Sequence, residues 1–338
     1  MKKTAEFVSL GHPDKTADYI SSYILDRMIE QDASVRYAVE VMVKDNTVVL
    51  GGEVAGKIDL SNLHEYVLQA LTEIGYTREY AQVWQNCALE PDKIKTVNLI
   101  GQQSPEISQG VEQNGWGDQG VFVGYACQGE GLINRELFLA RKLNDELYAL
   151  AKDDKRLGLD IKTQITLDDE GNIETAIAAV PMLEEVDLTH FIIKTLSEKP
   201  KNIIVNGTGR YTCHSAIADC GITGRKLAVD FYSTACPVGG GSPWTKDGSK
   251  ADVTLNLYAR KLAVKNLQDD DECLVYLSSC IGRSCLPSAV VKHIKRGKIT
   301  TSDLVIDKTP IELIKELGLN KPIFAQLCRN SFVKSIID

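Results

Sequence analysis

Apolar residues at helical spacing follow a short polar segment near the start of the chain. Ala17, Ile20, Ile24 and Met28 recur every three or four positions after the segment Gly11-His12-Pro13-Asp14-Lys15. Such spacing places apolar side chains on one face of a helix. Proline is tolerated in the first helical turn, where its missing N–H group would have no partner. The pattern therefore predicts a helix that begins near His12 and Pro13.

The next segment alternates apolar and polar residues, which is the period of a half-buried strand. Residues 35–44 alternate in this way, Asp45-Asn46 forms a turn, and residues 47–50 continue the pattern up to Gly51-Gly52-Glu53. Two such runs joined by a short polar turn are typical of a β-hairpin. Serine is a favourable helix N-cap, and we expect Ser61 to cap a second helix over residues 63–74.

This order of helix, hairpin and helix occurs again along the chain. The second occurrence has a helix, two strands around a polar turn, and a helix, at residues 137–150, 161–167, 173–180 and 188–196. A third and weaker occurrence has a helix, a strand and a helix, at residues 257–264, 274–281 and 311–317. Antiparallel sheets with helices packed on one face are the natural result. We predict an α+β fold of three similar domains related by pseudo-threefold symmetry.

Composition excludes several classes of protein. The chain has 338 residues with 43% hydrophobic and 25% charged content, which is ordinary for a globular protein. No apolar run approaches the roughly 18 residues of a membrane span, and charge interrupts the N-terminus before the apolar core of a secretory signal. The formal charge of −8 argues against general nucleic-acid binding, because that task needs a basic surface. We expect a cytoplasmic protein without a membrane or nucleic-acid partner.

The chain contains nine cysteines, an odd number, and none of them form a CxxC pair. This pattern supports neither a disulfide framework nor a zinc site. We interpret them as reduced thiols that lie mostly in the core.

The first stretch with a chemical signature is the polar segment at the start of the predicted helix. His12, Asp14 and Lys15 lie at a helix N-terminus, where free N–H groups and the positive end of the helix dipole attract anions. Phosphate is the natural ligand of such a place. The alternative is a helix cap whose charged side chains are solvated.

A second stretch concentrates positive charge within the acidic chain. It follows Gly239-Gly240-Gly241 and has a net charge of +3 from five cations and two acids: Lys246, Lys250, Arg260, Lys261, Lys265, Asp247 and Asp252. A polyphosphate needs several cations at once, together with acidic groups that hold Mg²⁺. An exposed helix face explains Lys261 and Lys265, whereas Arg225-Lys226 adds two further cations.

Neither standard nucleotide-binding signature is present. The chain has no GxxxxGK[ST] segment, and GxGxxG fails because Gly207-Thr208-Gly209 is followed by Arg210-Tyr211-Thr212. A P-loop or Rossmann enzyme is therefore not indicated. The residues alone predict an enzyme that handles a polyphosphate with a divalent metal.

Taken in order, the glycine-rich and charged motifs closely resemble those of the S-adenosylmethionine synthetase family. The resemblance is collinear over residues 6–290 and rests on these segments: Ser9-Leu10-Gly11-His12-Pro13-Asp14-Lys15, Gly51-Gly52-Glu53, Gln103-Ser104-Pro105-Glu106-Ile107, Gly117-Asp118-Gln119-Gly120, Gly209-Arg210, Asp219-Cys220-Gly221-Ile222-Thr223-Gly224-Arg225-Lys226 and Gly239-Gly240-Gly241 to Lys246-Asp247. Each motif is moderately specific, and the ordered set is much more so.

The resemblance implies three similar α+β domains woven from discontinuous segments. The corresponding repeat segments would be residues 1–100, 101–230 and 231–338. It also implies a homodimer or tetramer with active sites between subunits. The implied substrates are ATP and L-methionine. The methionine sulfur attacks C5′ of ATP, triphosphate leaves and is then hydrolysed to diphosphate and phosphate, and two Mg²⁺ and one K⁺ assist. A thioether is already nucleophilic, so the protein must mainly align the reactants and stabilise charge on the triphosphate.

The resemblance also implies roles for individual residues. His12 would lie near the departing oxygen and phosphates, and the triphosphate would be bound by Lys15, Lys162, Arg225, Lys226 and Lys246. Asp14 and Asp252 would each hold a Mg²⁺ and Glu40 the K⁺, while Tyr211 would stack on adenine and Asp160 would reach the ribose. Methionine would contact Glu53, Gln103, Asp118, Asp219, Lys250 and Ile281. Plain core positions for Tyr211 and Ile281, and a solvated Glu40, are the alternatives.

The chain departs from the family pattern at several positions. Leu10, Glu106, Gly207, Val238 and Val253 stand where Glu, Asp, Pro, His and Arg are usual. His214-Ser215-Ala216 replaces a Gly-Gly-Pro turn on the adenine side. The segment between Gln103 and Gly117 is shorter, which predicts a smaller or differently gated loop over the site. The end of the chain, from Thr309 to Asp338, lacks the usual aromatic and glycine-rich tail.

Two other functions are compatible with the same cluster of charges. One is a regulatory homologue that binds ATP or S-adenosylmethionine without turnover, although the retained Lys246, Lys250 and Asp252 argue against it. The other is a tripolyphosphatase that does not use methionine. The dependence of phosphate release on methionine discriminates the three hypotheses.

Overall fold

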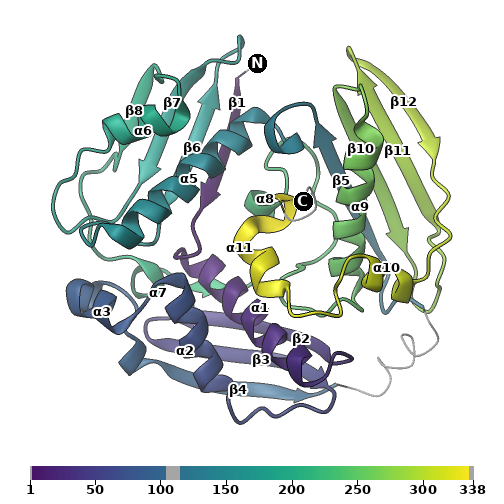
Figure 1. The fold of residues 1–338 in the computed structure, drawn as a ribbon, viewed down its shortest axis with the longest axis horizontal. Coiled ribbons are helices and arrows are strands. Elements are labelled where there is room, and N and C mark those ends of the chain that lie inside the picture. The colour runs from purple at the N-terminus through teal and green to yellow at the C-terminus, as the bar shows by residue number, and fades with distance from the viewer. Residues whose placement is uncertain (1, 104–114, 335–338) are drawn as a thin grey trace.

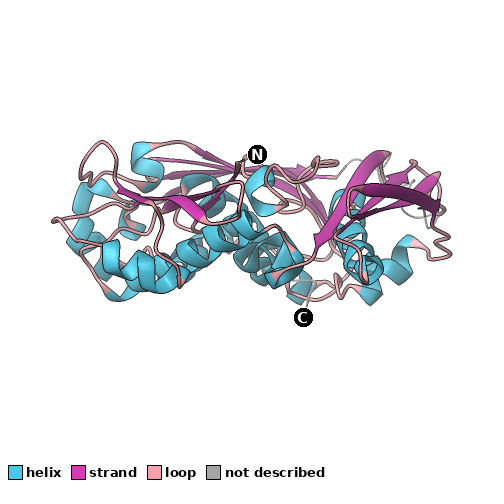
Figure 2. Cartoon of the chain, turned by 90° about the horizontal axis from the view of Figure 1, so that it is seen from above, coloured by secondary structure: helices cyan, strands magenta, loops and turns pink. Residues whose placement is uncertain are grey.

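Three four-stranded sheets surround the centre of the molecule. The structure is a computed structural model and describes residues 2–103 and 115–334. Figure 1 shows the three sheets side by side, and Figure 2 shows that the long helices gather on one side of them. The predicted α+β fold with helices on one face is confirmed, with mostly antiparallel sheets. The motif Ser104-Pro105-Glu106-Ile107 and most of the shortened loop lie outside the described residues.

The first sheet joins the N-terminal strand to the middle of the chain. Its order is β1 (Lys3–Val8), β6 (Lys162–Leu167), β7 (Ile173–Ala179) and β8 (Asn202–Val205). The β6–β7 hairpin forms as predicted, whereas β7 and β8 run parallel. Helix α5 (Arg135–Asp153) packs on β1 and β6, as its apolar spacing predicts.

The second sheet carries the first predicted hairpin. Its order is β4 (Lys95–Gln102), β3 (Thr47–Ala55), β2 (Arg36–Lys44) and β9 (Gly221–Ile222), and β3 and β4 run parallel. Two details differ from the prediction. Strand β3 continues through Gly51-Gly52-Glu53, so Glu53 lies within the strand rather than at its end. Ser61 does not cap α2 (Leu63–Ile74), because its hydroxyl donates to Asp59 and the N-cap residue is Asn62.

The third sheet contains a hairpin that the sequence pattern did not reveal. Its order is β12 (Lys298–Asp303), β11 (Ser288–Lys295), β10 (Glu272–Ser279) and β5 (Gly120–Cys127). All six residues of β12 are exposed, so the strand lacks the alternation of a half-buried sheet. Helices α9 (Ala251–Leu267) and α10 (Pro310–Glu316) agree with the predicted positions, and α9 packs against β5 and β10.

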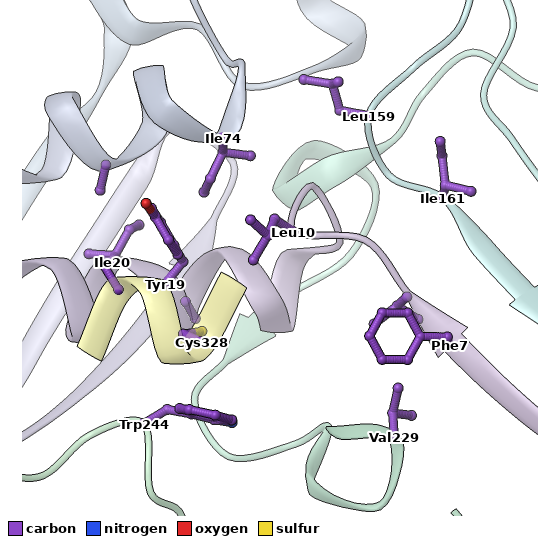
Figure 3. Close-up of a cluster of buried hydrophobic side chains, with 14 of the residues drawn as sticks. Phe7, Leu10, Tyr19, Ile20, Ile74, Leu159, Ile161, Val229, Trp244 and Cys328 are labelled. Atoms are coloured by element: carbon purple, nitrogen blue, oxygen red, sulfur yellow. The ribbon is translucent and has the colours of Figure 1, made fainter. Parts of the chain in front are cut away.

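Helix α1 (Pro13–Gln31) lies at the centre of the packing. Nearly all of its residues are buried, because it contacts α2, β2, β9 and α11. Figure 3 shows Leu10, Tyr19 and Ile20 of this region in the core with Cys328 of α11. The remaining helices are α3 (Arg78–Trp84), α6 (Thr189–Leu196), α7 (Ser215–Ala218), α8 (Leu227–Asp230) and α11 (Phe324–Lys334). Within residues 2–103 and 115–334, no helix is both long and apolar enough to cross a membrane.

The cysteines are all unpaired thiols, as expected. Their predicted location mostly in the core is wrong, since only Cys127, Cys236, Cys273 and Cys328 are buried. Of the other five, Cys87, Cys220 and Cys280 are partly buried, and Cys213 and Cys285 are exposed.

Candidate active site

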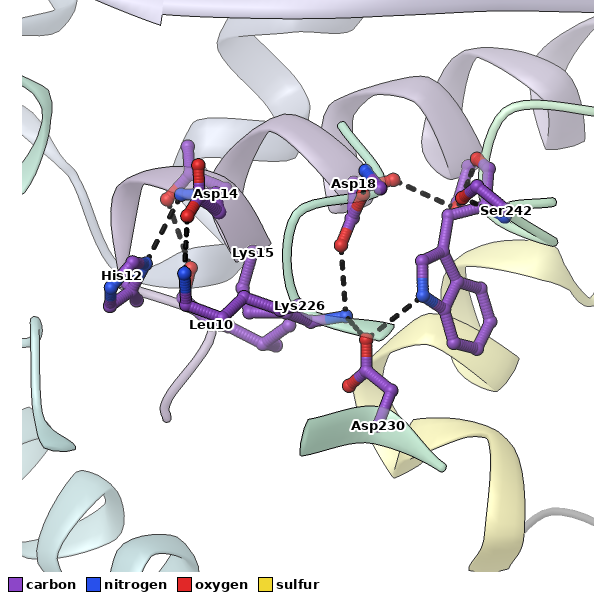
Figure 4. A network of polar contacts seen from close by, with 12 residues as sticks. Leu10, His12, Asp14, Lys15, Asp18, Lys226, Asp230 and Ser242 are labelled. Carbon is purple, nitrogen blue, oxygen red and sulfur yellow. Dashed lines mark hydrogen bonds and ion pairs between the residues drawn. The ribbon is translucent and has the colours of Figure 1, made fainter. Parts of the chain in front are cut away.

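The start of α1 gathers a carboxylate, an imidazole and two cations, which we call the Asp14 group: His12, Asp14, Arg225 and Lys226. The Asp14 side chain is buried, with Oδ2 at 2.5 Å from Lys226 Nζ and Oδ1 at 3.6 Å from Arg225 Nε. Its Oδ1 also accepts a hydrogen bond from Ile222 N at 2.9 Å. Figure 4 shows His12 and Lys226 next to Asp14, with the bond from Asp14 N to His12 and that from Lys226 to the carboxylate as dashed lines. The structure therefore brings together residues more than 200 positions apart in the chain.

Close backbone packing allows this meeting of α1 and β9. A Cβ atom at Gly221 would lie 2.2 Å from the carbonyl oxygen of Pro13, so only glycine lets the strand pass the helix start at this distance. The same strand then presents Ile222 N to Asp14, and Arg225 and Lys226 follow it in the chain.

His12 is neutral at physiological pH. Its burial, and next the positive charge of Lys226, lower the pKa of the imidazole to about 4. His12 Nδ1 accepts a hydrogen bond from Asp14 N at 3.2 Å. In a neutral ring with an accepting Nδ1, the proton is on Nε2. The ring can thus donate one hydrogen bond from Nε2 to an oxygen at the helix N-terminus.

Asp160 and Lys162 lie beside this group at the start of β6. Burial raises the pKa of Asp160 to about 7, and the charges of Asp219, Lys226 and Asp14 also act on it. Asp160 Oδ2 accepts a hydrogen bond from Ser215 N at 2.9 Å. Lys162 Nζ is 2.8 Å from Glu6 Oε2. These neighbours place several of the predicted ATP ligands around one helix terminus.

Tyr211 lies on the loop before α7, close enough to Asp160 for the charge of that carboxylate to act on its phenol. Its carbonyl oxygen accepts a hydrogen bond from Met182 N at 2.8 Å, and burial raises the pKa of its phenol. The ring is half-buried rather than enclosed in the core.

A second cluster forms at the start of α9, which we call the Lys246 group: Gly241, Lys246, Lys250 and Asp252. Lys246 Nζ is 2.5 Å from Asp252 Oδ2, and Gly241 N donates to Asp252 Oδ1 at 3.1 Å. Lys250 is the N-cap residue of α9, and Lys246 forms a β-bridge with Ala38 of β2. The structure therefore brings Gly241, Lys246 and Asp252 of the second stretch together. Arg260 of the same stretch does not join them, because it is buried and donates to the carbonyl oxygens of Tyr125 and Leu132.

The two groups are separate within one chain. In residues 2–103 and 115–334, no hydrogen bond or ion pair that we find joins the Asp14 group to the Lys246 group. The two groups lie toward opposite ends of β2. Lys246 forms a β-bridge with Ala38 near the start of the strand, whereas Ile222, which donates to Asp14, pairs with Met42 near its end.

The predicted methionine and potassium ligands also occur as neighbouring pairs. Gln103 Nε2 donates to Glu53 Oε1 at 3.3 Å, and the Thr223 hydroxyl donates to Glu40. Beside the third sheet, Trp116 forms an isolated β-bridge with Ile281, and the Asp118 carbonyl accepts from Ser279 Oγ at 2.9 Å. Ile281 is 56% exposed, so it is not a core residue in the single chain.

Lys15 does not join the Asp14 group, contrary to the expectation that it binds triphosphate. Its Nζ atom is 2.7 Å from Asp230 Oδ2 and 3.2 Å from Asp18 Oδ2, and it lies over the ring of Trp244. Figure 4 shows this ammonium pointing away from Asp14. The side chain is 3% exposed, so two carboxylates already neutralise it in the interior. Asp18 lies one helical turn after Lys15, which is the spacing that could have indicated the pair.

We expect replacement of Lys15 by methionine to destabilise the fold. The variant would leave the buried carboxylates of Asp18 and Asp230 without their cation, and breaking a buried ion pair costs about 3 to 5 kcal/mol. Urea unfolding would measure the loss, with Lys265→Met on the exposed side of α9 as the control. An unchanged midpoint for Lys15→Met would contradict a structural role.

The described part of the chain has no preformed cluster of metal ligands. No group of three or more His, Cys, Asp and Glu side chains converges there. Asp14 and Asp252 each offer carboxylate oxygens beside a lysine. This donor set fits Mg²⁺, which is commonly held by one or two carboxylates and by phosphate oxygens of the substrate.

The fold has a close counterpart among solved structures. A structure from Campylobacter jejuni, described as an unusual S-adenosylmethionine synthetase, superposes with a TM-score of 0.85 at 30% sequence identity. The match covers 98% of this chain and 94% of that one. The three-sheet architecture is thus that of an S-adenosylmethionine synthetase.

Sequence comparison gives the family. The profile of the S-adenosylmethionine synthetase N-terminal domain matches residues 1–105, and that of the C-terminal domain matches residues 213–336. The S-adenosylmethionine synthase of Helicobacter hepaticus is 33% identical over 354 aligned positions, which cover 95% of this chain and 89% of that protein. The chain belongs to the S-adenosylmethionine synthetase family, and this membership supports a role in S-adenosylmethionine synthesis.

Proposed function

We propose that this chain makes S-adenosylmethionine from ATP and L-methionine. The methionine sulfur attacks C5′ of ATP, the bond from C5′ to the triphosphate oxygen breaks, and the triphosphate is then hydrolysed to diphosphate and phosphate. The observation that carries the proposal is the pairing of Asp14 with Lys226 and of Asp252 with Lys246, each at the start of a long helix.

The residues present suit this reaction without a nucleophilic side chain. The triphosphate gains negative charge as it leaves, and fixed cations stabilise such charge in the transition state. We assign this role to Arg225, Lys226, Lys246 and Lys162. Neutral His12 would donate from Nε2 to the departing oxygen, since its Nδ1 already accepts from Asp14 N. Asp160 and Tyr211 would hold the adenosine part.

Methionine would lie between the remaining predicted ligands. We assign Glu53, Gln103, Asp118, Asp219, Lys250 and Ile281 to this substrate. The hydrogen bond between Gln103 and Glu53 supports a common site for these two side chains. Asp118 and Ile281 flank the third sheet, where Trp116 forms a β-bridge with Ile281 and the Ser279 hydroxyl donates to the Asp118 carbonyl.

Cations complete the proposed site. Asp14 and Asp252 would each hold one of two Mg²⁺ ions, which would neutralise the triphosphate, and Glu40 would hold K⁺. Glu40 is exposed and accepts a hydrogen bond from Thr223, so its carboxylate is available to a bound ion.

The open face of the second sheet supports a homodimer with active sites between subunits. Cross-strand register puts Glu40, Met42, Val97, Leu99 and Ile222 on the face that the helices do not cover. The four apolar side chains of this set, Met42, Val97, Leu99 and Ile222, are each at least 36% exposed in the single chain. Contiguous exposed apolar residues mark protein interfaces. In the proposed dimer, the Asp14 group of one chain and the Lys246 group of the other would contribute to the same site.

The nine unpaired thiols support a reducing location such as the cytoplasm, because disulfides persist mainly in oxidising compartments.

Mass spectrometry of the reaction mixture tests the proposal. The chain would be incubated with ATP, Mg²⁺, K⁺ and methionine, and the sulfonium product, phosphate and diphosphate would be measured. We expect equal amounts of all three. Phosphate release that is unchanged without methionine would favour a tripolyphosphatase. Nucleotide binding without any product would favour a regulatory homologue.

A further inference from the structure

A buried histidine joins the two segments that carry the proposed adenosine ligands. His214 replaces the first position of the family's Gly-Gly-Pro turn, and it is 1% exposed. Its ring packs edge-on against Trp84 with centroids 4.7 Å apart. A Cβ atom at Gly158 would lie 3.1 Å from His214 Cε1, so the segment before Asp160 fits closely against the imidazole. The sequence-based prediction places this residue near the proposed adenine-binding side of the site but assigns it no role.

The hydrogen bonds of His214 define its protonation. Nδ1 is 2.8 Å from the carbonyl oxygen of Thr212, which can only accept, so Nδ1 carries the proton. Nε2 then accepts from the Tyr80 hydroxyl at 2.6 Å. The same hydroxyl oxygen accepts from Leu159 N at 3.1 Å. Burial lowers the pKa of the imidazole to about 4, which keeps the ring neutral in this arrangement.

These bonds form a continuous chain between two backbone segments. It runs from Leu159 N through the Tyr80 hydroxyl and the His214 ring to the carbonyl of Thr212. Leu159 precedes Asp160, and Thr212 follows Tyr211 in the sequence. A separate bond from Ser215 N to Asp160 Oδ2 at 2.9 Å links the segments again. The relative position of Asp160 and Tyr211 therefore depends on His214.

We propose that His214 is a positioning residue that, together with Tyr80, sets the affinity of the site for the adenosine part of ATP. This inference rests on the proposed function, which places adenosine between Asp160 and Tyr211. The phosphate-binding cations lie outside the hydrogen-bond chain, because none of its members contacts Arg225, Lys226 or Lys246 in the described residues. Loss of these hydrogen bonds should weaken nucleotide binding while leaving inorganic polyphosphate binding intact.

Titration calorimetry with two probes tests this separation. The probes are adenylyl imidodiphosphate, a non-hydrolysable ATP analogue, and inorganic tripolyphosphate, both with Mg²⁺. His214→Phe removes both imidazole hydrogen bonds and retains a ring, and Tyr80→Phe removes only the hydroxyl. Tyr66→Phe on α2 is the matched control, since its hydroxyl contacts only Gln31 among the described side chains.

We expect His214→Phe and Tyr80→Phe each to raise the dissociation constant of the analogue about tenfold, the effect of losing a net hydrogen bond. Tripolyphosphate affinity should change less than twofold. The double variant should lose less binding free energy for the analogue than the sum of the two single losses, because both substitutions break the same series of hydrogen bonds. Equal losses for both probes, or none for the analogue, would overturn the inference. If His214→Phe does not fold, the binding constants of Tyr80→Phe for the two probes test the inference alone. A wild-type chain that binds both probes but makes no product would contradict the proposed function alone.

Discussion

Replacing Lys246 with methionine is expected to lower the rate of S-adenosylmethionine formation by about 10³-fold, the upper range for one preorganised electrostatic group. Methionine keeps most of the aliphatic length and removes the charge. Lys246 Nζ is held at 2.5 Å from Asp252, and its side chain is 25% exposed. The variant thus deletes a cation at an accessible, fixed place and buries no unpaired group. The proposed triphosphate would lose a partner as its charge develops.

Lys261→Met is the matched control for this variant. Lys261 lies on α9, which begins five residues after Lys246. It pairs with Glu316 and is 41% exposed, and we expect its replacement to leave the rate within twofold of wild type. Product formation by mass spectrometry and urea unfolding would be measured for both variants. A Lys246→Met protein that folds normally and keeps more than a tenth of the activity would contradict the assignment.

Local patterns were sufficient for the elements that build the Asp14 group. The helical spacing after Pro13 and the alternation over residues 35–44 predicted the start of α1 and both ends of β2 within one or two residues, whereas β3 continues five residues beyond its predicted alternation. The alternation arises because one face of β2 is buried along its length, and the helical spacing arises because apolar residues of α1 recur every three or four positions. The ordered motifs assigned Asp14, Lys226, Lys246 and Asp252 to one site, and the structure pairs Lys226 with Asp14 and Lys246 with Asp252.

The sequence-based predictions failed for elements that are buried on every side or exposed on every side. Strand β12 is exposed along its length, so no alternation marks it. Helix α1 is buried on almost every side, so the sequence could not tell that Lys15 points inward while Asp14 faces Lys226. The partner of Lys15 on α8, Asp230, is 215 residues away, and no local rule connects them. The hydrogen-bond chain at His214 is hidden for the same reason.

Mixing two inactive variants is expected to restore activity if the active sites lie between subunits. Asp14→Asn damages the Asp14 group and Lys246→Met damages the Lys246 group, and each homodimer should be inactive. In a twofold dimer with shared sites, the heterodimer would have one site with both defects and one with neither. Heterodimers isolated with two different affinity tags should therefore show about half the wild-type rate per dimer.

The matched control pairs two defects in the same group. A heterodimer of Asp14→Asn with Lys226→Met would have one damaged Asp14 group in each site, so it should stay inactive. If each site were built within a single chain, the first heterodimer would be as inactive as this control, because each chain would carry its own defect. Restored activity in the first pair only would require that the Asp14 group of one chain meets the Lys246 group of the other. That geometry would also account for the lack of a hydrogen bond or ion pair between the two groups in residues 2–103 and 115–334, although both are proposed to bind the same triphosphate.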